Sequence, residues 1–426
     1  MQLRFLSDHR TRLWIVLALL VLLVAGLILS YFFVPGFGRR GSSTVIPRAL
    51  PGLASDGRYD TETRVPGIWL SIRDRLTGPV PAGQQTVHLP FSAFTVTKTR
   101  TMDDAYRSTE LVAEDILLYA QAMAEQGRRA DFLSFMDDFE RLFLQGTNPV
   151  ERVIVTAGDV EVGREDYALW FDYEKALLLA WQRWPEAKIE QSIRRGIASL
   201  KPLFLSGGLG KAADIPDDVT YPWVSSDITP TPAPPPEDER IIILAELDLY
   251  VLDALAAFDA DFARYYESWL ATASSSIAAV GAPFPAYAVW AADDAYIYVQ
   301  GDSFSVSAET VLTTLLSLAE CGVKPEASLD FFRQALLDGR GLNQHYRISD
   351  GAPVGEPAFA DLYALAARLG RAAGDDLLAE LAISALNRFY ASSQTSLIFG
   401  AMFRDAPDNG FDMMLNDNAR AILALH

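Results

Sequence analysis

The feature that most constrains the fold is a series of helical segments that begins near Thr101 and continues to the C-terminus. Apolar residues in these segments recur every three to four positions, which is typical of helices that bury one face. The segments come in pairs separated by short breaks, such as the one at Gly127. The paired segments are 113–127 with 130–146, 167–184 with 187–205, 242–258 with 262–280, 307–322 with 328–339, and 358–370 with 377–393, and one more segment covers 416–426.

Helical hairpins in series must bury their apolar faces on one another. Five or six hairpins can close into a ring, so the pattern predicts an all-α protein built as an (α/α)6 toroid. An open helical-repeat rod is the alternative that the same pattern allows. Residues 83–100 are rich in β-branched and aromatic side chains and predict one or two strands. The proline-rich, acidic stretch 225–240 predicts a surface loop within the ring.

The N-terminal region contains an apolar stretch from Leu13 to Val34 without a charged residue. At about 1.5 Å per residue, such a helix crosses a hydrocarbon core of roughly 30 Å. A cleaved signal peptide is the alternative, but its apolar region is shorter. We therefore expect a signal-anchor, with a cytoplasmic tail (1–12), a transmembrane helix (13–34), a tether (35–60) and an extracytoplasmic domain (61–426).

Composition excludes several classes of function. The net charge of −19 leaves no excess of basic residues to neutralise phosphates, so we expect no nucleic-acid partner. One cysteine, Cys321, ends an apolar helical segment and predicts core packing. The four histidines lack metal-ligand spacing, and the nucleophile-elbow, phosphate-loop and dinucleotide motifs are missing from the sequence. We therefore expect neither a metal nor another cofactor.

Acidic residues beside aromatic residues are the remaining chemical signal. Cleavage of a glycosidic bond needs one carboxyl group that protonates the leaving oxygen and a second that activates water or stabilises the charged sugar. Aromatic rings can then stack on the sugars, although aromatics at helical spacing are more often core residues. The candidates for substrate binding are Trp170, Tyr173, Trp223, Trp290, Asp294 and Tyr296, with Asp293 beside them.

Four segments, taken in chain order, resemble the motif segments of glycoside hydrolase family 8. They are RSTELVAEDILLYAQAMAEQGRRADFLSFMDDFERLF at 107–143, WFDYEKALLLA at 170–180, YVQGDSFSVSAETVLTTLL at 298–316 and FADLYALAARLG at 359–370. This resemblance implies a six-hairpin toroid. It also implies that Glu110 is the general acid and Asp302 the general base, and that Asp172 helps to hold or distort the sugar.

The motifs also depart from the family pattern. Leu111 and Ala113 replace the glycines that follow the acid, Trp170 takes the place of an aspartate, and Ser305 and Ser307 replace an arginine and a proline. On residue physics alone, Glu110 is expected in the first turn of a helix capped by Ser108, where a negative charge is stabilised by the helix dipole. Glu114 and Asp115 are interpreted as ordinary solvated charges of the same helix.

Three functions are compatible with these observations. The first is a membrane-anchored glycosidase that hydrolyses, with inversion, a β-linked cell-surface polysaccharide or exopolysaccharide such as a β-glucan. The second is a non-catalytic protein that binds glycans or assists exopolysaccharide assembly through a degenerate toroid site. The third is an open helical scaffold that binds protein, which predicts a continuous concave surface and no central pocket.

Overall fold

The structure is a computed structural model, and the chain divides into two units, Met1–Ile46 and Pro47–His426. All residues that the structure describes belong to the second unit. The described residues are 50, 64–97, 105–156, 159–205, 240–280, 283–286, 288–292, 295–299, 305–406 and 410–426. The predicted membrane span, the tether apart from Leu50, and nearly all of the proline-rich stretch 225–240 therefore lie outside them. No described helix has the length and apolarity that a membrane crossing requires.

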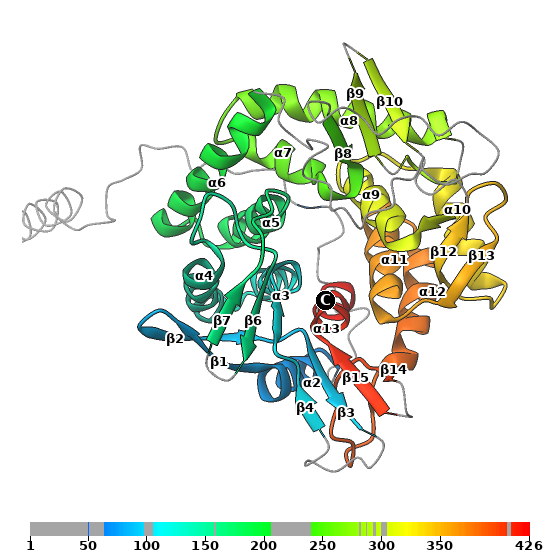
Figure 1. Cartoon of the computed structure of the whole chain (residues 1–426). Coiled ribbons are helices and arrows are strands. Elements are labelled where there is room, and N and C mark those ends of the chain that lie inside the picture. The colour runs from blue at the N-terminus through cyan, green and yellow to red at the C-terminus, as the bar shows by residue number, and fades with distance from the viewer. Residues whose placement is uncertain are drawn as a thin grey trace, which may run out of the picture. The chain divides into compact units, whose positions relative to one another are not determined.

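Six of the described helices form an inner ring. Each contacts the next along the chain, and the last helix, α13, packs against the first, α3, so that the ring closes (Figure 1). These helices are buried on nearly every side, which explains why they are apolar almost all round. The inner helices are α3 (Ala113–Glu125), α5 (Leu169–Arg183), α7 (Leu249–Leu255), α9 (Ala308–Glu320), α11 (Ala360–Ala373) and α13 (Leu415–Leu425).

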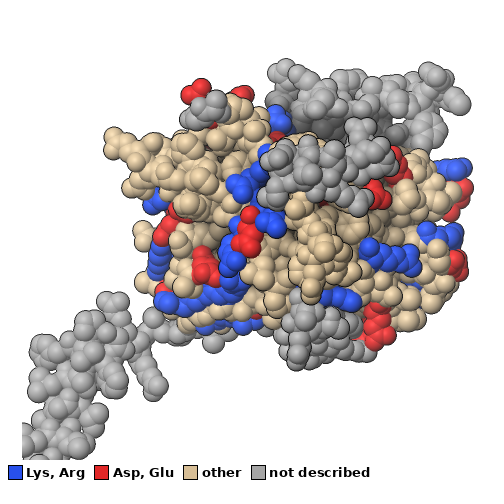
Figure 2. Space-filling view, turned by 90° about the horizontal axis from the view of Figure 1, so that it is seen from below, with Lys and Arg blue, Asp and Glu red and all other residues tan. Residues whose placement is uncertain are grey.

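A second layer of helices surrounds the inner ring. These helices bury one face and expose the other, where ion pairs such as Arg128 with Asp131 lie at the surface. Figure 2 shows one face of the domain on which acidic and basic side chains lie side by side. The outer helices are α4 (Arg129–Phe143), α6 (Ala187–Leu205), α8 (Asp261–Val280), α10 (Glu326–Leu337) and α12 (Asp376–Leu386), each following its inner partner in the chain.

The sixth hairpin joins the two ends of the described chain. Helix α2 (Arg64–Ser71), which is followed by a π-helical turn (Ile72–Leu76), packs against α13. The sequence analysis did not predict α2, because eight residues that include Pro66 and Gly67 show little helical periodicity. With α2 in place, the toroid has six hairpins, and the alternative of an open rod is wrong.

The domain is mostly helical, as predicted, but it also contains short antiparallel strands after Thr101 that an all-α fold did not predict. The predicted strands within 83–100 are confirmed by β2 (Gln85–Pro90) and β3 (Ala93–Val96). The sheets are β1 (Thr77–Ala82) with β2; β5 (Glu110–Val112), β6 (Arg152–Thr156) and β7 (Asp159–Val162); β8 (Arg240–Ile243), β9 (Ala288–Ala292) and β10 (Ala295–Val299); β11 (Ser305–Ser307), β12 (Asn343–Arg347) and β13 (Pro353–Pro357); and β14 (Arg404–Ala406), β15 (Gly410–Met414), β3 and β4 (Ala105–Arg107).

The strands lie where the inner helices begin. Strand β5 runs directly into α3, β11 runs into α9, and β15 runs into α13. Strand β15 also pairs with β3, so a strand near the C-terminus is held in one sheet with a strand from the N-terminal part of the domain. Cys321 is buried at the end of α9, as predicted. The sheets that contain β5, β11 and β15 therefore lie at the end of the ring where these inner helices have their N-termini.

The contact that seats α2 can be tested at Gly400. This residue has a φ of 87°, and a Cβ atom there would lie 2.9 Å from the backbone oxygen of Gly67 in α2. We expect Gly400→Ala to lower the free energy of unfolding by about 2–4 kcal/mol, because strain and a backbone clash add. Gly322 is the matched control, because its φ is 84° and a Cβ atom would meet nothing within 4 Å. Gly322→Ala should cost about 1 kcal/mol in chemical denaturation, and equal losses would contradict the proposed packing.

Candidate active site

A pocket of about 350 Å³ opens in the middle of the ring, at the N-terminal ends of the inner helices. Every inner helix contributes to its wall, either directly or through the residue that caps it. The contributing side chains include Glu114 of α3, Asp172 of α5, Asp248 at the N-cap of α7, Glu309 of α9, Arg368 of α11 and Arg420 of α13. A central pocket of this kind contradicts the prediction for an open scaffold.

Carboxylates at this end of the ring follow from the helix termini. Glu114, Asp172 and Glu309 lie in the first turns of their helices, and Asp248 Oδ1 accepts a hydrogen bond of 3.0 Å from the backbone N–H of Val251. A helix N-terminus carries a partial positive charge that stabilises a nearby anion by about 0.3–1 kcal/mol. The toroid directs these N-termini toward one pocket, and so it collects their acids there.

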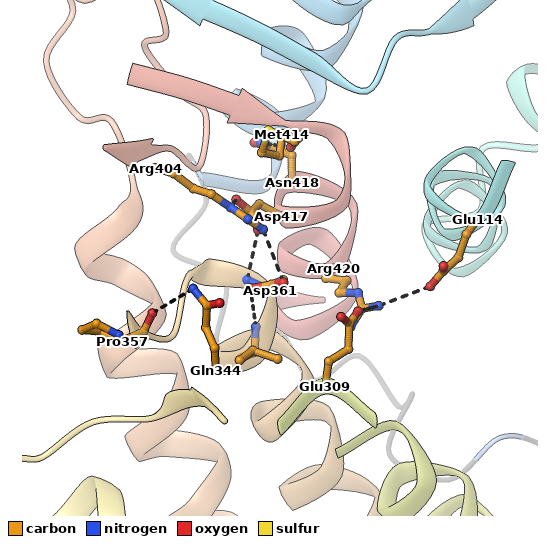
Figure 3. Close-up of polar contacts among 11 residues, drawn as sticks. Glu114, Glu309, Gln344, Pro357, Asp361, Arg404, Met414, Asp417, Asn418 and Arg420 are labelled. Atoms are coloured by element: carbon orange, nitrogen blue, oxygen red, sulfur yellow. Dashed lines mark hydrogen bonds and ion pairs between the residues drawn. The ribbon is translucent and has the colours of Figure 1, made fainter. Parts of the chain in front are cut away.

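A buried arginine connects two of these acids. The Arg420 Nη2 atom lies 2.7 Å from Glu309 Oε1 and 3.5 Å from Glu114 Oε1, and the guanidinium points between them (Figure 3). Arg420 itself is buried, whereas the side chains of Glu114 and Glu309 are about half exposed, at 51% and 46%. Both carboxylates are therefore accessible from the pocket, and both are paired with the buried guanidinium of Arg420.

Glu114 and Asp172 have strongly perturbed acidity. Burial within the ring raises the pKa of Glu114, the positive charge of Arg420 lowers it, and Glu309 and Asp166 raise it further. Burial also raises the pKa of Asp172 well above its usual value, and the negative charges of Glu114 and Asp248 add to this effect. The surface of Glu114 that is exposed faces a recessed pocket instead of bulk water, so its hydration is incomplete.

A lysine and an arginine stabilise the deeper part of the pocket. Lys175 Nζ lies 2.7 Å from Asp248 Oδ2 and 2.7 Å from Glu320 Oε2. Arg368 Nη2 lies 3.6 Å from Glu320 Oε1 and 3.7 Å from Glu125 Oε1. All of these side chains except Asp248 are buried. A network of buried charged side chains therefore lies beneath the residues that line the pocket.

Of the predicted catalytic residues, the structure places Asp172 in the pocket and Glu110 outside the described lining. Glu110 is not in a helix as predicted, because it belongs to β5 and pairs with Ile154 of β6. Its carboxylate lies 3.7 Å from Arg152 Nη1 and is 39% exposed. Asp302 lies outside the described residues, so its role as the base stays a prediction.

The interpretation of Glu114 and Asp115 as ordinary solvated charges is wrong. Glu114 lines the pocket, and Asp115 is buried with a pKa raised to about 7 by burial and by the charge of Glu114. A signal for this existed in the sequence. Glu114, Gln121 and Glu125 are polar residues on one face of a helix that, apart from Asp115, is otherwise mostly apolar, which indicates a polar interior on that face.

Trp170 and Tyr173, two of the predicted sugar-stacking residues, do not line the pocket. Trp170 and Tyr173 are buried in the core, where Trp170 Nε1 donates to Asn148 Oδ1 at 3.2 Å and the Tyr173 hydroxyl donates to Glu140 Oε1 at 2.6 Å. Neither ring has a free face for a sugar. Among the described lining residues, Phe171 is the only aromatic one. Trp290 and Tyr296 lie in β9 and β10 with their side chains outside the described atoms, and Trp223 and Asp294 lie outside the described residues.

This chain is similar to several solved structures. No protein-family model and no curated protein sequence matches this chain. A structure described as a novel alpha-amylase from Clostridium perfringens is 16% identical, has a TM-score of 0.64, and aligns over 86% of this chain and 98% of its own. A xylanase of family 8 from Teredinibacter turnerae, solved with xylohexaose, is 10% identical, with a TM-score of 0.56 over 88% and 95%.

A beta-1,3-1,4-glucanase from Paenibacillus sp. X4 is 11% identical, with a TM-score of 0.55 over 85% of this chain and 90% of its own. The domain has the fold of the family 8 glycoside hydrolases. The (α/α)6 toroid implied by the sequence resemblance is thereby confirmed. Identities in this range demonstrate the shared fold alone, so the chemistry of the site has to be argued from its own residues.

The charge network beneath the pocket predicts a pH dependence of stability. Burial raises the pKa of Glu125 to about 7, while Arg368 and Arg371 oppose this shift. Because the unfolded chain ionises this group near pH 4.3, its burial destabilises the fold progressively as the pH rises from about 4 to 7. Glu125→Gln removes this penalty. In chemical denaturation, we expect the free energy of unfolding of the variant, relative to that of the wild type, to increase by about 1–3 kcal/mol from pH 5 to pH 8.

The measurement at pH 5 serves as the internal reference for Glu125→Gln. At that pH the wild-type carboxyl group is protonated in the folded state, so the two proteins differ little in charge. A stability difference that stays constant from pH 5 to pH 8 would contradict the assigned pKa.

Proposed function

We propose that this protein is a glycoside hydrolase whose proton donor is Glu114, with Asp172 as its partner carboxyl group. The observation that carries the proposal is the pair of acids with raised pKa values at one central pocket. Burial raises the pKa of both carboxyl groups and so favours their protonated forms. A retained proton on a carboxyl group is what a general acid for glycosidic cleavage requires.

In the proposed reaction, Glu114 donates its proton to the glycosidic oxygen while the bond between that oxygen and the anomeric carbon breaks. Its half-exposed carboxyl group gives it access to a bound sugar. Asp172 lines the same pocket and is proposed to hold the sugar at the cleavage point. For inversion, a water molecule attacks the anomeric carbon from the opposite face and loses a proton to a base. Asp302 remains the proposed base.

The proposed substrate is a β-linked polysaccharide. Two of the similar structures are named for enzymes of β-glucans and xylans, but the one with a TM-score of 0.64 is named an alpha-amylase. The substrate panel should therefore contain a mixed-linkage β-glucan, a xylan and an α-glucan. Activity on the α-glucan alone would contradict the β-linkage while leaving the proposed acid in place.

One observation favours non-catalytic glycan binding as a second candidate. Glu309 and Asp248 are already paired with Arg420 and Lys175, and the described lining offers Phe171 as its only aromatic ring. A site of this kind could hold a glycan through hydrogen bonds without cleaving it. Binding of an oligosaccharide by a wild-type protein that releases no reducing ends would establish this candidate.

A pair of glutamate variants tests the assignment of the acid. Glu114→Gln removes the proton donor and should lower kcat by a factor of about 10²–10⁴, the usual contribution of general acid catalysis. Glu110→Gln is the matched control four residues away, because Glu110 lies in β5 outside the described lining of the pocket. It should keep kcat within about threefold of the wild type. Hydrolysis is followed by the release of reducing ends, and the opposite result would restore Glu110 as the acid.

We also propose that residues 13–34 anchor the protein in the cell membrane, with the toroid on the extracytoplasmic side. The support is the uncharged apolar stretch in the sequence. The full chain should sediment with membranes and resist alkaline carbonate extraction, whereas a chain that starts at residue 35 should remain in the supernatant. In spheroplasts, externally added protease should digest the toroid. Protection of the toroid from the protease would reverse the proposed orientation.

A further inference from the structure

The shape of the central pocket bears on how a glycan enters it. The inner helices run in the same direction, because the first turns of α3 and α9 meet at Arg420 while their last turns meet at Arg368. Lining residues nearer the C-terminal end of each helix therefore lie deeper along the ring axis. The pocket extends down this axis instead of across the face of the ring.

Two walls give nearly the same depth for this pocket. On α3 the lining runs from Glu114 to Gln121, and on α9 it runs from Glu309 to Ser317. These intervals are seven and eight residues, which give nearly the same depth of about 10–12 Å at 1.5 Å per residue. A sugar ring that passes the carboxylates therefore has room below them.

The described residues close the pocket at its deep end. Below Gln121 the ring axis is filled by the buried side chains of Glu125, Glu320 and Arg368. The wall includes residues of all the inner helices or, for α7, its N-cap, so it surrounds the axis on every side. A glycan chain that entered along the axis would find no exit within this part of the protein.

The floor of the pocket carries hydrogen-bond donors that lack acceptors. Gln121 and Arg368 both line the pocket and are only 1% and 7% exposed. Gln121 Nε2 has no hydrogen-bond partner. Arg368 Nη2 has only ion-pair contacts of 3.6 and 3.7 Å with Glu320 and Glu125, which are longer than hydrogen bonds. A buried donor without an acceptor destabilises the protein. Hydroxyl oxygens of a sugar seated on the floor would supply the missing acceptors.

From this geometry we propose that the pocket receives the end of a glycan chain, with the terminal sugar resting on Gln121 and Arg368. This inference rests on the proposed function, since it describes how the substrate of that site is held. The terminal sugar lies below the carboxylates, and the bond next to it lies beside Glu114. Cleavage then removes short units from a chain end and leaves internal bonds intact.

End-capped oligosaccharides test this proposal by binding alone. The probe is the full chain carrying Glu114→Gln, titrated calorimetrically with cellohexaose, xylohexaose and maltohexaose. Each oligosaccharide is used free, with a 4,6-O-benzylidene cap on its non-reducing end (for xylohexaose, a 4-O-benzyl ether), or with an aromatic amide label on its reducing end. We expect one of the two caps to weaken binding at least tenfold and the other to change it less than twofold. Equal binding of all three forms would overturn the proposal.

A floor variant adds an independent readout. Gln121→Leu, introduced into the Glu114→Gln protein, removes the buried donor without a large change in volume. It should weaken binding of the free hexasaccharide about fivefold to tenfold and leave binding of the end-capped form unchanged. Circular dichroism and thermal unfolding establish that the variant is folded. An equal loss for free and capped forms would overturn the assignment of the floor.

Failure of this inference can be distinguished from failure of the proposed function. If a hexasaccharide binds and neither cap matters, the chain-end model is overturned and the glycosidase proposal stands. If no hexasaccharide binds and the wild-type protein hydrolyses no polysaccharide, both are overturned. On a polymer that the wild type hydrolyses, reducing ends should accumulate well before viscosity falls. An early fall in viscosity would indicate internal cleavage and contradict the proposal.

Discussion

The whole toroid depends on the packing of its last helix, α13, against its first, α3. Helix α13 also contacts α11 and the outer helix α2, so one element near the C-terminus joins both ends of the domain. It carries Arg420, whose guanidinium joins Glu114 of α3 to Glu309 of α9 across the ring. Near the start of α13, Asp417 accepts two hydrogen bonds of 2.6 Å from Arg404 (Figure 3). The contacts of α13 that close the ring therefore also fix the geometry of the site.

Closure also explains the chemistry of the pocket. Parallel inner helices bring several N-termini to one end of the ring, and each terminus favours an acid in its first turn. Burial raises the pKa values of Glu114 and Asp172, and neighbouring carboxylates add to the effect. Buried cations then become necessary, because unpaired buried charges are costly. Arg420, Lys175 and Arg368 are these cations, and their ion pairs fix the positions of the acids around the pocket.

Some of this was predictable, and the failures have physical causes. The hairpins from α3 to α12 were predicted because amphipathic periodicity is a local property that each segment displays on its own. Helix α2 was missed because it is short and contains Pro66 and Gly67, so contact with α13 determines its conformation. The strands after Thr101 were missed because most have only three to five residues. Glu114 was not recognised as a pocket residue because the helix start was placed too early, at Glu110, which belongs to β5.

The sequence by itself determined the helical hairpins, the apolar N-terminal stretch, and the acidic character of the first turns of the inner helices, because spacing and composition act locally. Only the tertiary structure decided which acids share a pocket and which aromatics are core. Trp170 and Tyr173 look like sugar platforms in the sequence, yet α5 is surrounded on all sides and buries them. Glu114 looks solvated in the sequence, yet ring closure sets it beside Arg420 and close to Asp172. Electrostatic coupling depends on distances in space, and these exist only once the ring has closed.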